Sequence, residues 1–158
     1  MRNIFYNCYN LEEIDLSKLN TENVTDMSNM FYNCKKIKRL NLSSFNTKNV
    51  INMECMFFEC NNLVDINLLS FNTKKVERMT KMFYHCIKLK KIDLSSFDFQ
   101  NVKYVLNMFY GCHKLTEIDL FFFNYVNENK LCNAIFGYNR LIKLEEPQNH
   151  IVKFSKSY

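Results

Sequence analysis

The sequence predicts an α/β solenoid with short parallel β-strands on one face and short helices on the other. The first observation behind this expectation is a 26-residue repeat that runs along the 158-residue chain. Five cysteines mark the repeat, each 26 residues after the last: Cys8, Cys34, Cys60, Cys86 and Cys112. Self-similarity at such a period is typical of proteins in which each repeat forms one rung of a stack.

The second observation is an aliphatic frame in the first half of each repeat, as in Ile37, Leu40 and Leu42. This is the L-x-x-L-x-L pattern of a leucine-rich repeat. Its last two aliphatic residues flank a polar one, so both point to one side of a short strand and the polar residue to the other. We therefore expect a leucine-rich-repeat solenoid whose stacked strands expose a polar column: Asp15, Asn41, Asn67, Asp93 and Asp119.

The third observation is a change of period in the second half of each repeat. Neighbouring repeats share the spacing of one helix face, which in one repeat is formed by Val50, Met53, Met56, Phe57 and Cys60. Asn49 precedes the valine, and Asn is a favourable N-cap residue. We expect a short helix that packs its Met-Phe face on the strands, because it is too short to be stable alone.

A mostly aromatic column joins the two halves of the repeat: Leu19, Phe45, Phe71, Phe97 and Phe123. An Asn or Asp follows each of these residues, at positions 20, 46, 72, 98 and 124. Such side chains bond to nearby backbone groups in turns. We therefore expect them to satisfy backbone groups of the neighbouring rung.

The chain divides into a repeat array, residues 1–146, and a C-terminal cap or tail, residues 147–158. The array holds about five and a half rungs, because Ile4–Cys8 corresponds to the second half of a repeat and the array starts there. Pro147 ends the array, since proline cannot donate to a strand ladder. Solenoids need polar caps, so the first rung, which has none, is expected to favour self-association.

Composition narrows the classes of function. Hydrophobic residues make up 47% of the chain and charged residues 23%, as in a globular domain. A net charge of +5 is modest, so nucleic acid is not the expected partner. No apolar run reaches the roughly 18 residues of a membrane helix, so no membrane insertion is expected. The basic cluster Lys35–Arg39 leaves an anionic partner as an alternative.

No constellation of residues predicts an enzyme, a cofactor or a metal site. The seven cysteines contain no C-x-x-C pair, so zinc is not expected. The cysteine column fits buried, reduced thiols, although stacked rungs would also bring disulfide partners within reach. His85 and His113 lie beside column cysteines, but adjacent side chains point apart, so no thiol-imidazole pair is expected.

The repeat segments Leu89–Phe97 and Phe45–Cys60 resemble the BspA-like leucine-rich repeats, and the resemblance covers roughly residues 4–144. It implies a right-handed solenoid with a binding role, often adhesion to host or neighbouring cells. It also implies a cell-surface or secreted protein, although residues 1–8 lack the apolar stretch of a signal peptide. The family has no shared catalytic residues.

We expect the function to be non-catalytic binding of a protein or a glycan through the strand face. One outward column varies in charge from rung to rung: Glu13, Arg39, Asp65, Lys91 and Glu117. A column that varies on a regular exposed surface is where a repeat protein can encode recognition. With the neighbouring outward columns, the candidate binding residues are Arg39, Asn41, Asp65, Asn67, Lys91, Asp93, Glu117, Asp119 and Phe121.

Two alternatives stay open at this point. Phe121 stands where other repeats carry serine, and it either packs in the cap or serves as an exposed anchor for a partner. The whole chain is alternatively a structural or vestigial fragment of a longer repeat array, with no ligand of its own.

Overall fold

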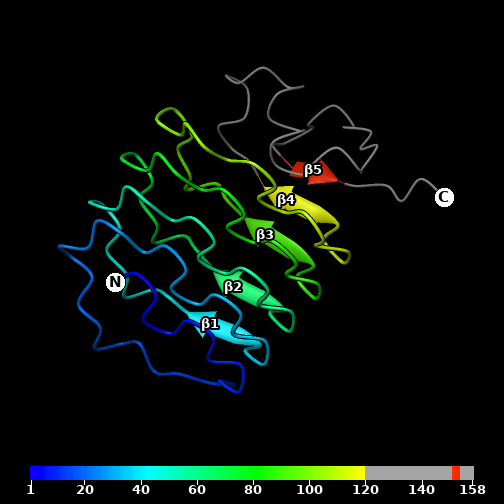
Figure 1. The fold of residues 1–158 in the computed structure, drawn as a ribbon. Coiled ribbons are helices and arrows are strands. Elements are labelled where there is room, and N and C mark those ends of the chain that lie inside the picture. The colour runs from blue at the N-terminus through cyan, green and yellow to red at the C-terminus, as the bar shows by residue number, and fades with distance from the viewer. Residues whose placement is uncertain (120–150, 154–158) are drawn as a thin grey trace.

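The computed structural model describes residues 1–119 and 151–153. Residues 1–119 form a stack of similar rungs (Figure 1). The three-residue strands are β1 (Arg39–Asn41), β2 (Asp65–Asn67), β3 (Lys91–Asp93), β4 (Glu117–Asp119) and β5 (Ile151–Lys153). β1 pairs in parallel with β2 and β3 with β4, while β5 is antiparallel to β4. Paired residues of parallel strands are 26 apart, as Leu40 and Ile66 are, which confirms the predicted stack of short parallel strands.

Each of the first three strands buries its middle residue and exposes the two flanking ones. Leu40, Ile66 and Ile92 point into the core, because successive side chains of a strand point to opposite sides. The last aliphatic residue of the frame is buried as well, at Leu42, Leu68 and Leu94. The aliphatic frame therefore faces the core, as predicted.

The predicted helices are absent from the described residues, where the second half of each rung forms consecutive turns. The N–H groups of Met56, Phe58 and Cys60 donate to carbonyls three residues back, over 3.3, 3.1 and 3.2 Å. The N–H groups between them donate to the next rung instead, as Phe57 does to Met82 over 2.9 Å. The described solenoid therefore has strands on one side and turns on the other, and the helical half of the predicted α/β class was wrong there.

Residues with left-handed backbone explain why these segments are not helical. A right-handed helix needs negative φ at every residue, yet two residues per rung, four positions apart, have φ between 53° and 77°. They are Asn3, Asn29, Cys55, Lys81 and Asn107 in one column, and Asn7, Asn33, Glu59, His85 and Gly111 in the other. Asn and Gly tolerate this conformation best, so these asparagines favour turns. Asn49, the expected N-cap, instead donates to the carbonyl of Glu22 in the preceding rung over 3.0 Å.

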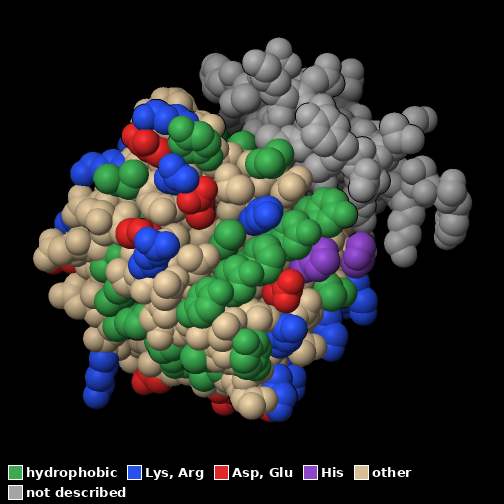
Figure 2. Space-filling view, in the orientation of Figure 1, with side chains coloured by type: hydrophobic (Ala, Val, Ile, Leu, Met, Phe, Trp, Pro, Cys, Tyr) green, Lys and Arg blue, Asp and Glu red, His purple; other side chains and the backbone are tan. Residues whose placement is uncertain are grey.

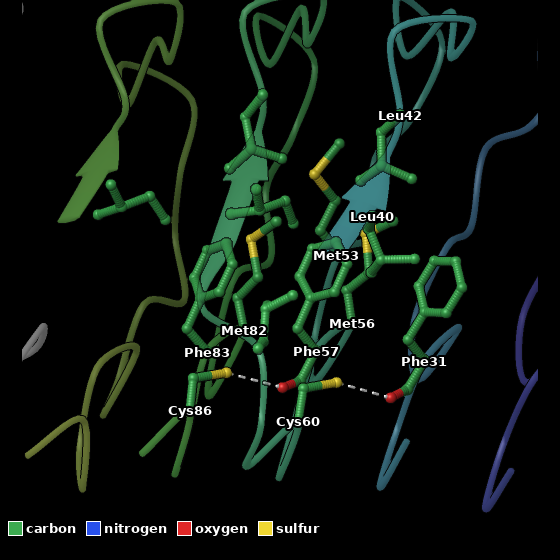
Figure 3. Close-up of a cluster of buried hydrophobic side chains, with 14 of the residues drawn as sticks. Phe31, Leu40, Leu42, Met53, Met56, Phe57, Cys60, Met82, Phe83 and Cys86 are labelled. Atoms are coloured by element: carbon green, nitrogen blue, oxygen red, sulfur yellow. Dashed lines mark hydrogen bonds between the residues drawn. The ribbon is translucent and has the colours of Figure 1, made fainter. Parts of the chain in front are cut away.

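The core between strands and turns consists of like side chains stacked on like (Figure 3). The rings of Phe31, Phe57 and Phe83 form one stack, with centroids 5.7 and 5.1 Å apart. A second stack contains Phe45 and Phe71, whose centroids are 6.4 Å apart. Burial of large aromatic side chains is the main source of stability in such a core, so each rung is held chiefly by its neighbours.

Buried threonines join the backbones of neighbouring rungs. The Thr47 side chain is 1% exposed, and its hydroxyl donates to the Asn72 carbonyl over 3.0 Å and accepts from the Asn72 N–H over 2.8 Å. The Asn46 side chain instead accepts from the N–H of Lys48 in its own rung, over 3.3 Å. The expectation that the asparagine column would bridge rungs was therefore wrong, because the threonine that follows it points inward and takes that place. The same bridge recurs at Thr21 and Thr73.

Replacing Asn29 with Ala tests whether this segment forms a helix or a turn. Ala is the best helix former, so a helix would gain stability from the change. At a residue whose φ is 53°, Ala should instead lower the free energy of unfolding, measured in urea, by about 1 kcal/mol. Asn29→Gly, which tolerates this φ, should lose less. An Asn29→Ala protein at least as stable as the wild type would contradict the turn.

Thr47→Val keeps the shape of the buried side chain and removes both of its bonds to the next rung. The N–H and the carbonyl of Asn72 then lose these partners, so the free energy of unfolding should fall by about 1–3 kcal/mol. Thr116→Val is the matched control, because the exposed Thr116 hydroxyl makes a single bond of 3.3 Å; its effect should stay within about 0.5 kcal/mol. Equal effects of the two changes would show that the bridge does not join the rungs.

Candidate functional site

The strand face carries the charged column predicted from the sequence. Arg39, Asp65 and Lys91 are exposed, and Glu117 is half-buried. The parallel register sets Arg39 beside Asp65 and Lys91 beside Glu117. The Lys91 ammonium lies 2.6 Å from the Glu117 carboxylate, a surface pair of the kind that contributes little to stability. Charges of opposite sign therefore alternate along this face.

The polar column beside it has a structural role that sequence reasoning missed. Asn41, Asn67 and Asp93 are exposed, but one oxygen of each side chain accepts from the N–H two residues later, over 3.1, 3.0 and 2.8 Å. These Asx-turns close the backbone where each strand ends. Only the remaining polar atoms of the column are free to meet a partner. Asp119 is the last residue of β4, and Phe121 lies outside the described residues.

The turn side of the stack carries an aromatic stripe that the sequence analysis did not identify. It consists of Tyr6, Tyr32, Phe58, Tyr84 and Tyr110. Successive ring centroids are 4.7, 4.4, 4.8 and 5.1 Å apart, and the stripe is visible as a continuous hydrophobic band in Figure 2. Because the rings stack face to face, their edges meet the solvent. The sequence feature that could have revealed the stripe is the pair of adjacent aromatic residues in each repeat, since two neighbours cannot both point into the core.

Polar groups flank the aromatic stripe. The Lys81 ammonium lies 5.5 Å from the centre of the Tyr84 ring, close enough for a cation–π contact. The His85 ring stacks on Tyr84 with centroids 4.4 Å apart, and a Cβ added at Gly111 would collide with it. Cys86, next to His85, is buried in the core, so the two do not form a thiol-imidazole pair.

The cysteine column forms a row of hydrogen bonds inside the core (Figure 3). The thiol of Cys60 donates to the carbonyl of Phe31, and that of Cys86 to Phe57, each over 3.2 Å. Burial raises the pKa of the Cys34 thiol to about 12, so it stays protonated at neutral pH and is a poor nucleophile. The predicted buried, unbridged thiols are confirmed at Cys34, Cys60, Cys86 and Cys112, whereas Cys8 is only half-buried and Cys132 lies outside the described residues.

Metal ligands do not gather in the part of the chain that the structure describes. Residues 1–119 and 151–153 hold no group of three or more His, Cys, Asp or Glu side chains placed to share an ion. The same residues contain no helix long and apolar enough to cross a membrane. Two regular outward surfaces, the strand face and the aromatic stripe, run along this region.

Sequence comparison relates the chain to a protein family. A family model described as "Mycoplasma protein of unknown function, DUF285" matches residues 1–121, which is 121 of the 158 residues. The match therefore includes every rung that the structure describes. No curated protein matches the chain, and no solved structure does.

The buried thiols should be measurable both by their reactivity and by the pH dependence of stability. Alkylation of the native protein at pH 8 should leave the four buried column cysteines unreacted, and all seven cysteines should react after unfolding without reductant. Because burial raises the pKa of Cys34, the unfolded thiol ionises first. Stability from this group is complete below about pH 9 and is lost as pH rises toward about 12.

The free energy of unfolding should therefore decline over this alkaline range, and less steeply in Cys34→Ala than in the wild type. Fewer than seven reactive thiols after unfolding would instead indicate disulfides between rungs.

Proposed function

The chain belongs to the family of Mycoplasma proteins of unknown function called DUF285, and from this premise we propose that it is a non-catalytic binding module. It recognises a protein or a glycan through the strand face of the solenoid. The resemblance of its repeats to the BspA-like leucine-rich repeats supports this proposal, because that resemblance implies adhesion and display at the cell surface.

The observation that carries the proposal is the contrast between inward and outward columns. Inward positions hold the same kind of residue in rung after rung, such as Leu40, Ile66 and Ile92, because each must stack on its neighbour. The adjacent outward column changes sign from Arg39 to Asp65 on a flat, exposed and regular surface. Stacking does not require that variation, so it is available to specify a partner.

The alternation of charge also limits what kind of partner fits. A uniform polyanion would meet Asp65 as well as Arg39, and the repulsion would offset much of the attraction. A protein or glycan surface with charges of alternating sign matches the column better, because electrostatic complementarity governs specificity more than affinity. We therefore favour such a partner over nucleic acid.

The test is a quadruple variant in which Arg39, Asp65, Lys91 and Glu117 are replaced with Ser. Wild type and variant are compared on a defined glycan array and on a panel of purified host-surface proteins. Circular dichroism should not change, because these side chains lie outside the core, and binding to at least one ligand retained by the wild type should fall at least about tenfold.

A second variant, with Lys48, Lys74 and Lys81 replaced by Ser, locates the surface. If every ligand retained by the wild type survives the strand-face changes but is lost in this lysine variant, the site lies elsewhere on the rung and the proposal is contradicted. A wild-type protein that retains no ligand on either panel would favour the structural fragment with no ligand of its own.

A further inference from the structure

We propose a second binding site, for a sugar that carries a carboxylate or phosphate group, in a polar pocket beside the aromatic stripe. The pocket has a volume of about 460 Å³, within the range of small-molecule sites. It is separate from the strand face, so this proposal does not rest on the function proposed above. Its lining residues are Arg2, Ser28, Asn29, Asn52, Glu54, Cys55, Arg78, Thr80 and Lys81.

The pocket is a product of stacking, because it spans several rungs and no single repeat contains it. Arg2, Ser28, Glu54 and Thr80 occupy one column, at intervals of 26 residues. The other lining residues come from two nearby columns of the same rungs. One of them includes Asn52, which forms a parallel bridge with the next rung. The side chains in each column differ, so neighbouring rungs together create an arrangement of groups that occurs once in the described residues.

The charges of the lining favour an anion. The carboxylate of Glu54 is already held by two bonds from the Arg78 guanidinium, of 2.9 and 3.2 Å. Arg2 and Lys81 form no ion pair within the described residues. The pocket therefore presents two positive groups without a carboxylate partner, and a bound carboxylate or phosphate would supply one.

Unpartnered polar groups of the lining favour a ligand with hydroxyl groups. Ser28 is only 4% exposed, yet its hydroxyl forms no hydrogen bond with the described residues; only its backbone is bonded. The Thr80 hydroxyl and the Asn29 amide, also on the lining, have no such bond either. The polar groups of Ser28, Asn29 and Thr80 line the pocket and are not used by the protein's own hydrogen bonds, so they are available to hydroxyl groups of a ligand.

The side chains of the lining favour a polar ligand over an apolar one. Eight of the nine lining residues carry a polar or charged group, and Cys55 is the exception, whereas small-molecule pockets are usually lined mainly by hydrophobic side chains. A molecule that is polar over most of its surface and negatively charged at one end fits these groups. Sugar acids and sugar phosphates share that chemistry.

The experiment is a titration of the ¹⁵N-labelled protein with glucuronate, glucose 6-phosphate, glucose and inorganic phosphate, followed by amide chemical shifts. One or both of the sugar anions should cause saturable shifts at Asn29, Cys55 and Thr80. Glucose and inorganic phosphate should bind at least about tenfold more weakly than the better sugar anion, because each lacks one half of the recognised chemistry. Binding of only one sugar anion identifies whether the pocket takes a carboxylate or a phosphate.

Variants matched to other rungs test the cations without disturbing the stack. Arg2→Ser and Lys81→Asn introduce the residues that Ser28 and Asn29 provide at the same positions of the repeat. Combined, they should weaken binding of the better sugar anion at least about tenfold. Lys74→Gln, which introduces the residue found at Gln100, removes a positive charge away from the pocket and should leave affinity unchanged.

Several results would overturn the proposal. These are the absence of saturable shifts at the pocket, equal binding of glucose or inorganic phosphate, and unchanged affinity in the double variant. The rate of alkylation of the half-buried Cys55 provides a second readout, because a ligand in the pocket should slow it. Cys55→Asn, which matches Asn29, identifies the part of the alkylation signal that comes from this thiol.

Discussion

Every second amide of the turn segments donates its hydrogen to the neighbouring rung, and the rest of the stack depends on these bonds. Asn29 donates to Glu54 over 2.9 Å and Phe31 to Met56 over 2.8 Å. A buried amide left without an acceptor costs about 1–3 kcal/mol. Each rung must therefore place a carbonyl opposite each donor N–H of the preceding rung. This requirement keeps the length of the rung constant along the stack and sets identical positions above one another. The aromatic stacks and the row of thiols follow from it.

The same constraint separates the residues that hold the fold from those that are free to bind. A side chain that points inward must match the side chain above and below it, as Phe57 matches Phe31 and Phe83. A side chain that points outward meets no such demand, and different residues then adjoin in neighbouring rungs. Glu54 beside Arg78 is an example, where two adjacent columns in neighbouring rungs bring opposite charges together. Surfaces with specific chemistry arise in this way from a monotonous scaffold.

Sequence alone predicted the strands, the inward aliphatic frame and the buried thiols. Each of these features follows from the residues at equivalent positions of the repeat. The helices were predicted wrongly. Consecutive turns that place Met53, Met56 and Phe57 inward reproduce the spacing of a helix face, and only the recurrent asparagines distinguish the two. The exposed positions of Arg39 and Asp65 were foreseeable from strand alternation. The polar pocket was not, since Ser28 and Lys81 come from different columns and different rungs, and the sequence does not show which columns share a pocket.

The bonds between turn segments also give the stack a direction. In the bonds from residues 27, 29, 31 and 33, and from their counterparts in the next two rungs, the N–H belongs to the earlier rung and the carbonyl to the later one, as between Phe31 and Met56. The peptide dipoles along this side are therefore aligned and add, as they do in an α-helix, but with the positive end toward the later rungs. Two like ends placed together would set carbonyl against carbonyl, or N–H against N–H. A further strand or copy that extends this row of hydrogen bonds must therefore add head-to-tail. Head-to-tail contacts build filaments rather than closed twofold dimers.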